Sequence, residues 1–271
     1  MDRIAASFAR LQATRRKALV PFFTAGDPSL DATVPLMHAL VEAGADIIEL
    51  GVPFSDPMAD GPTIQRSSER ALERGANTAY VFDCVRDFRQ RDPRTPVVLM
   101  GYLNPVEMRG YAAYARQAVA AGVDGVLLVD LPAEESGDAR SAFDQEGLKL
   151  IALASPTTTA ARMAVLARQA GGYVYYVSYA GVTGADRIDG DDVAGRTAEL
   201  RALSRVPVVV GFGIKDAASA SAMGKLADGI VIGSALVQAI STAVDAEDAQ
   251  DRARAFLRPL RTALDASSTV A

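Results

Sequence analysis

Histidine and cysteine are nearly absent from this 271-residue sequence, which contains one of each. Cys84 alone cannot form an internal disulfide, and no Cys or His spacing suits a structural zinc site, so we expect a reducing compartment and no bound metal. His38 lies in a segment with helical periodicity that ends at Gly44, which predicts a helix residue without a catalytic part. Acid–base chemistry therefore falls to carboxylates and tyrosines.

Clusters of basic residues and long apolar runs are missing as well. Lysine and arginine are spread along a chain of net charge −5, which disfavours binding to nucleic acid or to an anionic membrane surface. Charged residues interrupt positions 1–17, so this segment resembles neither a signal peptide nor a membrane span. The predicted location is the cytoplasm.

Short apolar runs rich in β-branched residues recur along the chain and are typical of strands. Eight such runs occur, at residues 18–26, 45–51, 96–102, 125–130, 149–155, 173–181, 207–213 and 229–235. Helical spacing is found at 111–121, 133–146, 159–170, 216–226 and 246–264. Strands that are apolar on both faces and alternate with helices predict a parallel sheet covered by helices.

The number of strands favours an α/β fold of the closed (β/α)8 TIM-barrel type, although an open doubly wound sheet obeys the same alternation. We predict one barrel domain over residues 1–271, with a frayed tail from about residue 266. An extra N-terminal helix is expected near Asp2–Leu11. An extra helix is also expected after strand 2, where Thr63–Glu73 and Thr78–Arg91 both show helical spacing.

Glu49 ends the second apolar run, and in a barrel the active site gathers at the carboxyl ends of the strands. It shares a strand face with Ile47, which places its carboxylate either in the interior or against the surrounding helices. A carboxylate removed from water must be paired, hydrogen-bonded or raised in pKa, and a pKa near neutrality suits proton transfer. We predict a catalytic role. A structural glutamate bonded to an arginine or a loop amide is the alternative.

The loop that follows, GVPFSDPMADGPTIQ, is dense in proline and glycine and contains Asp60. An Asp-Gly-Pro-Thr sequence suits the start of a helix, where Asp60 could cap the first turn. It could equally serve in catalysis, and spacing alone does not separate the two roles.

Glycines follow each of the last three strands, in GVTG at 181–184, GFG at 211–213 and GSA at 233–235. Barrels often bind phosphate there, through backbone N–H groups and the start of a short helix. Ser234 adds a hydroxyl, and residues 235–240 supply the short helix. Any one of these motifs alone would indicate only a tight turn. Tyr102, Tyr175 and Tyr179 also lie near strand ends, where a phenol either orients a substrate or packs.

Long motifs of this chain resemble the tryptophan synthase alpha chain family. The sequence reads IELGVPFSDPMADGPTIQ where the family has LELGVPFSDPLADGPTIQ, and GVTG, GFGI and GSA follow in order. PFFTAGDP, VLMGYLNP, VDLPAEE and ASPTTT extend the likeness over nearly the whole chain. The departures are Met58, Ser155 and Tyr179–Ala180, and none of them removes a catalytic group.

The resemblance implies a lyase that cleaves indole-3-glycerol phosphate by a retro-aldol reaction into indole and glyceraldehyde 3-phosphate, in L-tryptophan biosynthesis. Glu49 would move the protons, Asp60 would face the indole N–H, and Tyr175 would lie beside the substrate. The implied substrate-binding residues are Phe22, Tyr102, Thr183, Gly184, Phe212, Gly213, Gly233 and Ser234. Of these, Thr183 would pair with the Asp60 loop, and Phe22 and Phe212 would form the aromatic pocket wall. Gly184, Gly213, Gly233 and Ser234 would hold the phosphate.

The resemblance also implies that this chain needs no cofactor, and that pyridoxal phosphate belongs to a partner beta chain. The expected assembly is an αββα tetramer, docked through the loops at Pro53–Asp60 and around Asn104–Pro105.

Three other functions stay open at this point. The first is a free-standing indole-3-glycerol phosphate lyase with the same catalytic residues. A phosphosugar isomerase on the same barrel is the second, because fold alone does not fix function. The third is a non-catalytic module that only activates a partner.

Overall fold

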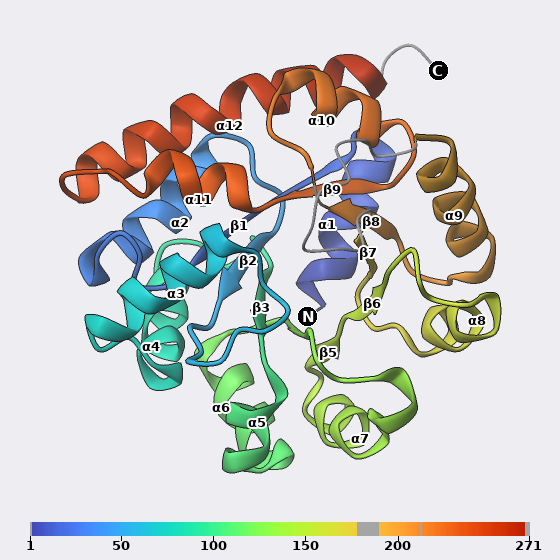
Figure 1. Cartoon of the computed structure of the whole chain (residues 1–271), viewed down its shortest axis with the longest axis horizontal. Helices are drawn as coiled ribbons and strands as arrows, with labels where there is room; N and C mark the ends of the chain where they lie inside the picture. Colours follow the sequence, from blue (N-terminus) through green and yellow to red (C-terminus); the bar gives the residue numbers. More distant parts are fainter. Residues whose placement is uncertain (1, 178–189, 212, 269–271) are drawn as a thin grey trace.

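The strands of the chain pair in parallel around a ring (Figure 1). The structure is a computed structural model, and it describes residues 2–177, 190–211 and 213–268. Hydrogen-bonded neighbours follow the order β5-β4-β3-β2-β1-β9-β8-β7-β6. The strands are β1 Ala18–Thr24, β2 Ile48–Gly51, β3 Val97–Gly101, β4 Gly125–Leu128, β5 Lys149–Leu150, β6 Ala152–Ala154, β7 Val174–Val177, β8 Val208–Gly211 and β9 Gly229–Ile232. This arrangement confirms the predicted α/β barrel.

The fifth predicted run forms two short strands, β5 and β6, which are separated by Ile151 alone. β5 pairs with β4, and β6 pairs with β7. The N–H of Ile151 still donates to Val126 O at 2.9 Å, so the chain passes directly from one pair to the other. Nine strands therefore fill the eight positions of the barrel, and the ring closes through this segment.

Helices surround the ring (Figure 1). They are α1 Arg3–Ala13, α2 Thr33–Glu42, α3 Pro62–Glu73, α4 Thr78–Arg89, α5 Leu103–Arg109, α6 Tyr111–Ala121, α7 Gly137–Glu146, α8 Ala160–Gln169, α9 Gly190–Leu203, α10 Ala217–Gly224, α11 Ser234–Ile240 and α12 Ala246–Ser268, with 3-10 turns η1 Leu30–Ala32 and η2 Ala133–Glu135. The extra helices α1 and α3–α4 occur where the sequence predicts them. In the described part of the chain, no helix combines the length and the hydrophobicity that crossing a bilayer requires.

Two helices differ from the prediction. The segment around Asn104–Pro105 was expected to be a loop, and this was wrong, because it forms α5 with Tyr102 at its N-cap. Pro105 lies in the first turn, where a missing N–H costs no intrahelical hydrogen bond. At the other end of the chain, α12 continues to Ser268, beyond the expected end at Leu264.

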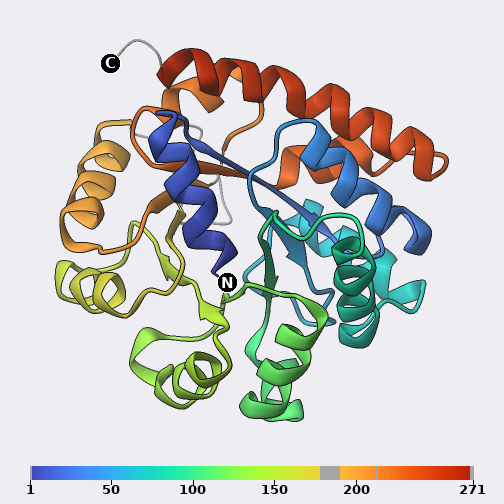
Figure 2. The same cartoon turned by 180° about the vertical axis from the view of Figure 1, so that it is seen from behind.

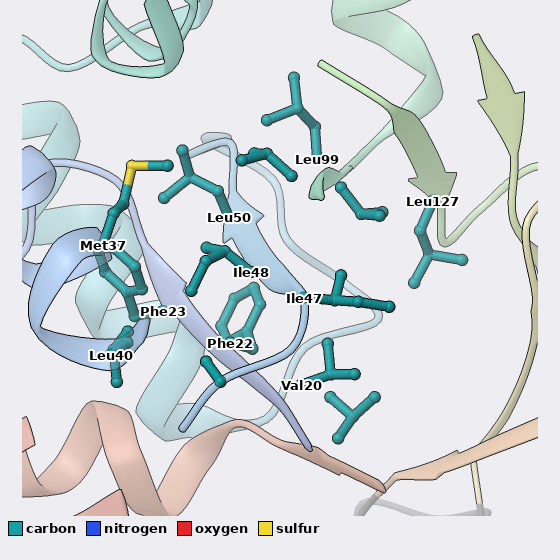
Figure 3. Close-up of a cluster of buried hydrophobic side chains, with 14 of the residues drawn as sticks. Val20, Phe22, Phe23, Met37, Leu40, Ile47, Ile48, Leu50, Leu99 and Leu127 are labelled. Carbon is teal, nitrogen blue, oxygen red and sulfur yellow. The ribbon is translucent and has the colours of Figure 1, made fainter. Parts of the chain in front are cut away.

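Residues of β1 and β2 alternate between two faces. Phe23, Ile48 and Leu50 pack with Met37 and Leu40 of α2 in the layer outside the barrel (Figure 3). Because side chains alternate along a strand, the neighbours of these residues in β1 and β2 face the barrel interior. This outer packing fixes which residues of each strand can reach a site inside.

The amino end of the barrel is covered by α1 (Figure 2). Asp2 caps this helix by accepting the N–H of Ala5 at 2.9 Å. Ile4, Phe8 and Leu11 lie buried against the strands. The opposite, carboxyl end is therefore the end left for a site.

Candidate active site

Glu49 projects from β2 into the barrel interior. It lies opposite Phe22 of β1 in the strand register. The phenol of Tyr173, just before β7, donates a hydrogen bond to Glu49 Oε2 at 3.4 Å. Since β2 and β7 are not neighbours in the sheet, this contact crosses the interior. The structure thus decides between the two faces that the sequence left open.

The Glu49 side chain is buried without a cation. Only 1% of the residue is exposed, and no described residue forms an ion pair with it. Burial raises the pKa of Glu49 to about 7, and the Tyr173 hydrogen bond opposes this rise. Near neutral pH both the acid and its conjugate base are populated, which suits a group that must both give and take a proton.

Asp60 lies in the loop between β2 and α3. The Tyr102 hydroxyl donates to Asp60 Oδ2 at 3.0 Å and accepts the N–H of Ala59 at 3.0 Å. Burial raises the pKa of Asp60 to about 6, against the effect of the Tyr102 hydrogen bond. The N-cap of α3 is Gly61, so the Asp60 carboxylate does not cap the helix and is free for other chemistry.

Two side-chain contacts hold the Asp60 loop. The Phe54 ring stacks on Tyr102 with centroids 5.0 Å apart. Gln65 Nε2 donates to the carbonyl of Asp60 at 2.7 Å. Further along α3, Arg70 makes a two-point ion pair with the buried Asp27, in the loop after β1, at 2.7 Å for each bond. Tyr102 and α3 therefore hold the Asp60 loop, and the ion pair ties α3 to the neighbouring loop.

Tyr175 lies on β7, two residues after Tyr173 and on the same strand face. Burial raises its pKa, and the Glu49 and Asp60 carboxylates raise it further. Tyr175 thus lies within electrostatic reach of both predicted catalytic carboxylates. A Cβ atom at Gly211 would lie 2.1 Å from the Tyr175 hydroxyl oxygen. Glycine at that position makes room for the phenol.

Phe22 links this group to the end of β9. A Cβ at Gly51 would meet the Phe22 ring at 2.8 Å, and one at Gly233 would meet it at 3.5 Å. The ring therefore lies between the end of β2 and the start of α11. Phe22 is 3% exposed and supplies an apolar surface beside Glu49.

A family model described as tryptophan synthase alpha chain matches residues 8–265. The chain belongs to this family.

Relatives in the tryptophan synthase alpha chain family agree along nearly the full length. The alpha chains of Xanthomonas campestris pv. campestris (strain B100) and Xylella fastidiosa (strain M12) are each 65% identical to it, over 98% of this chain and 98% or 99% of theirs. The crystal structure of tryptophan synthase subunit alpha from Legionella pneumophila str. Paris superposes with a TM-score of 0.91 at 44% identity, covering 98% of this chain and 99% of that one. Membership makes the chain an enzyme subunit of tryptophan biosynthesis and implies a beta-chain partner.

The structure describes three of the residues that the sequence predicts to bind phosphate, namely Gly213, Gly233 and Ser234. Gly213 has a φ of +74°, a conformation that glycine adopts freely. Gly233 is the N-cap of α11, and the exposed Ser234 is its first residue. The short helix after the last strand is thus confirmed. Thr183, Gly184 and Phe212 lie outside the described residues, as does Tyr179.

Tyr173 is the site residue that the sequence reasoning missed. It is fully buried and also packs on Phe8 of α1, with ring centroids 6.1 Å apart. Its position two residues before Tyr175 was the available signal, because alternate residues of a strand share a face. The sequence does not show that the hydrogen-bond partner of Tyr173 is Glu49, which lies across the barrel.

His38 lies away from this group. Its ring packs on Phe88 with centroids 4.8 Å apart, between α2 and α4. Burial lowers its pKa, and Arg91 lowers it further. Its Nε2 has no hydrogen-bond partner among the described residues. His38 is thus a residue of α2, which confirms the predicted helix, and it packs against α4.

Proposed function

We propose that the chain is a lyase that cleaves indole-3-glycerol phosphate into indole and glyceraldehyde 3-phosphate. One observation carries the proposal: the buried carboxyl group of Glu49 and the half-buried one of Asp60 lie at the carboxyl end of the barrel with tyrosine hydroxyls as their hydrogen-bond partners. Membership of the tryptophan synthase alpha chain family supports the choice of substrate.

Glu49 is proposed to move both protons of the retro-aldol step. Its acid form protonates C3 of the indole ring, which makes the ring an electron sink. As carboxylate, it takes the proton from the glycerol hydroxyl. The C–C bond then breaks, its electron pair returns to the ring, and neutral indole and an aldehyde result. A pKa of about 7 makes the two forms interconvert readily near neutral pH.

Asp60 is proposed to face the indole N–H. When C3 is protonated, positive charge develops on the ring, and a nearby carboxylate stabilises it. With a pKa of about 6, Asp60 is mainly ionised at pH 7. The Tyr102 hydrogen bond fixes the orientation of the carboxylate.

The other predicted residues would complete the substrate site. Tyr175 lies beside the substrate, and Phe22 and Phe212 form the pocket wall. The glycerol phosphate would be held by backbone N–H groups at Gly184, Gly213 and Gly233 and by the hydroxyl of Ser234. Thr183 would meet the Asp60 loop when substrate is bound.

Docking of a beta chain on the carboxyl face would complete an αββα tetramer. The Asp60 loop exposes 85% of Met58, and α5 exposes 80% of Met108. Exposed large apolar side chains are a common feature of interaction surfaces. Pyridoxal phosphate is proposed to reside on the partner alone, because in the proposed cleavage the protonated indole ring itself serves as the electron sink. As a step of amino-acid biosynthesis, the reaction is placed in the cytoplasm.

The test is release of indole from indole-3-glycerol phosphate by the purified chain, with and without a tryptophan synthase beta chain. We expect cleavage by the wild type, stimulation by the beta chain, and a loss of about 100-fold or more in Glu49→Gln. Glu49→Gln should still bind glycerol 3-phosphate. High turnover that a beta chain does not change would indicate a free-standing lyase, and absence of indole under both conditions would overturn the proposed reaction.

A further inference from the structure

A cleft of about 1160 Å³ opens at the amino end of the barrel, on the face opposite Glu49 and Asp60. Its walls are formed by residues along α1 and the turn after it, by the segments that lead into β7 and β8, and by the end of α10. Small-molecule sites generally have volumes of about 300–1,000 Å³, so the cleft is large enough for an organic ligand. Neither the proposed reaction nor the beta-chain docking face makes use of it.

The charge of the cleft is opposite to that of the whole chain. Seven basic and two acidic side chains line it, which gives a formal charge of +5 in a chain whose net charge is −5. Such a local excess of positive charge, partly shielded from water by the walls, attracts anions and concentrates them.

Three of these cations, Arg15, Arg205 and Lys225, have free side chains. Each is exposed, and none makes a side-chain hydrogen bond or ion pair with a residue that the structure describes. They come from three different elements: the turn after α1, the segment before β8, and the end of α10. A guanidinium group matches the geometry of a phosphate group with two parallel N–H donors.

The remaining cations are already engaged. Carboxylates hold three of them, in the pairs Arg16–Asp265, Lys149–Asp2 and Arg201–Asp228. Lys17 is half-buried, and its Nζ donates to Ala227 O at 2.7 Å. Burial removes part of the solvation of this ammonium and so lowers the pKa of Lys17. An anion beside it would restore part of that solvation.

Arg15 occupies a backbone position where glycine is favoured. Its φ is +54°, in the left-handed region, directly after α1 ends. The N–H of Arg16 bonds back to Leu11 O at 2.8 Å and closes the helix end. Glycine is the residue that fits such a position with least strain, yet the chain has an arginine there.

We propose that this cleft binds a small phosphorylated molecule with a flat apolar part, as in a nucleotide. The phosphate groups would lie among Arg15, Lys17 and Arg205. The apolar part would lie between Ala9 of α1 and the Val206–Pro207 segment, which line the same cleft. Ala9 is exposed and small, so the wall leaves room for a planar group. This site is independent of the lyase reaction.

Isothermal titration calorimetry of the full chain with ADP and with inorganic pyrophosphate tests the proposal. Saturating glycerol 3-phosphate is present throughout, so that the proposed phosphate site at the carboxyl end is occupied. We expect both probes to bind the wild type, with ADP the tighter. The double variant Arg15→Ala/Arg205→Ala should weaken binding at least about tenfold, because two charge-assisted hydrogen-bonding groups are lost.

The matched control is Arg94→Ala/Arg116→Ala, which removes the same charge from two exposed arginines outside the cleft. It should change affinity by less than about twofold. Equal weakening by the two double variants would mean that only net charge matters, and would overturn the site. Failure of both probes to bind at millimolar concentration would overturn it too. If ADP binds no more tightly than pyrophosphate, the assignment of the apolar wall is wrong.

Discussion

At the amino end of the barrel, the buried Asp124 carboxylate accepts hydrogen bonds from Arg3 at 2.9 Å, Arg89 at 2.7 Å and the backbone N–H of Val97 at 2.8 Å. At the carboxyl end, Glu49 meets a single tyrosine hydroxyl at 3.4 Å. Both groups are almost fully removed from water. Two arginine cations and a backbone N–H compensate the Asp124 carboxylate, whereas the Glu49 carboxyl group has a single neutral hydrogen-bond donor.

Asp46 and Asp60 repeat this contrast. Asp46, before β2, accepts from Arg261 of α12 at 3.0 Å and from the N–H of Leu19 at 3.1 Å. Burial raises its pKa, but Arg261 opposes the rise. Asp60 has the neutral Tyr102 instead. The arginine partners of Asp124 and Asp46 thus tie together segments distant in sequence at the amino end, while the tyrosine partners of Glu49 and Asp60 leave these two carboxyl groups able to titrate near neutral pH.

The largest expected effect is that of Asp60→Asn on turnover. The change keeps the shape of the side chain but removes the charge proposed to stabilise the indole ring, so kcat for indole release should fall by about 100-fold or more. Asp56→Asn is the matched control, because Asp56 is exposed in the same loop and its carboxylate accepts a hydrogen bond from the neighbouring Ser55 hydroxyl. It should change kcat by no more than about twofold. Similar small losses in the two variants would show that Asp60 does not act in the reaction.

Asp124→Asn should affect stability and leave chemistry intact. Removing this charge leaves the half-buried Arg89 without its ionised partner, and breaking a buried ion pair costs about 3 kcal/mol or more. Urea denaturation measures the loss. Asp83→Asn breaks the exposed pair with Arg86 and should cost less than about 1 kcal/mol. If the folded Asp124→Asn variant also loses turnover per molecule, the proposed division between the two ends of the barrel fails.

The third prediction concerns Glu49 and the pH dependence of stability. The pKa of Glu49 is about 7 in the folded chain, and its ordinary value of 4.5 applies to the unfolded chain. A raised carboxyl pKa favours the folded state fully below pH 4.5, and this contribution is lost as the pH rises to 7. Replacing Glu49 with Gln removes the effect. As the pH rises over this range, the free energy of unfolding of Glu49→Gln should therefore increase relative to that of wild type, by up to about 3 kcal/mol. A constant difference from pH 4.5 to 8 would show that Glu49 has an ordinary pKa.

Much of this arrangement follows from patterns among residues that are close in the sequence, and that part of the fold was predictable. The eight apolar runs and the helical spacing gave the barrel, and the position of Glu49 at the end of its run placed it at the carboxyl face. Where local signals conflict, prediction fails: proline suggested a loop at Asn104–Pro105, yet the first turn of α5 accommodates it.

The contacts that decide the chemistry are not local. Tyr173 reaches Glu49 across 124 residues of sequence, and Arg70 reaches Asp27 across 43. No spacing rule connects such pairs before the ring has closed. Gly211 illustrates the same point. Its glycine-rich motif predicts a phosphate-binding site, whereas the structure shows that the missing side chain leaves room for the Tyr175 ring.

The smallest expected effect, and the sharpest test of the comparison, is that of Tyr173→Phe. The Tyr173 hydrogen bond favours the ionised form of Glu49, so its loss should raise the pKa of Glu49 by about half a unit to one unit. Because the proposed reaction begins with the acid form of Glu49, the alkaline limb of the kcat/KM–pH profile should move upward by that amount, and kcat/KM at pH 7 should change by less than about tenfold. Tyr114→Phe is the control, because Tyr114 is also buried but packs between helices against Phe82 and Phe143. It should leave the limb where it is. A profile in Tyr173→Phe that drops equally at every pH would mean that the phenol positions Glu49 without tuning its proton affinity.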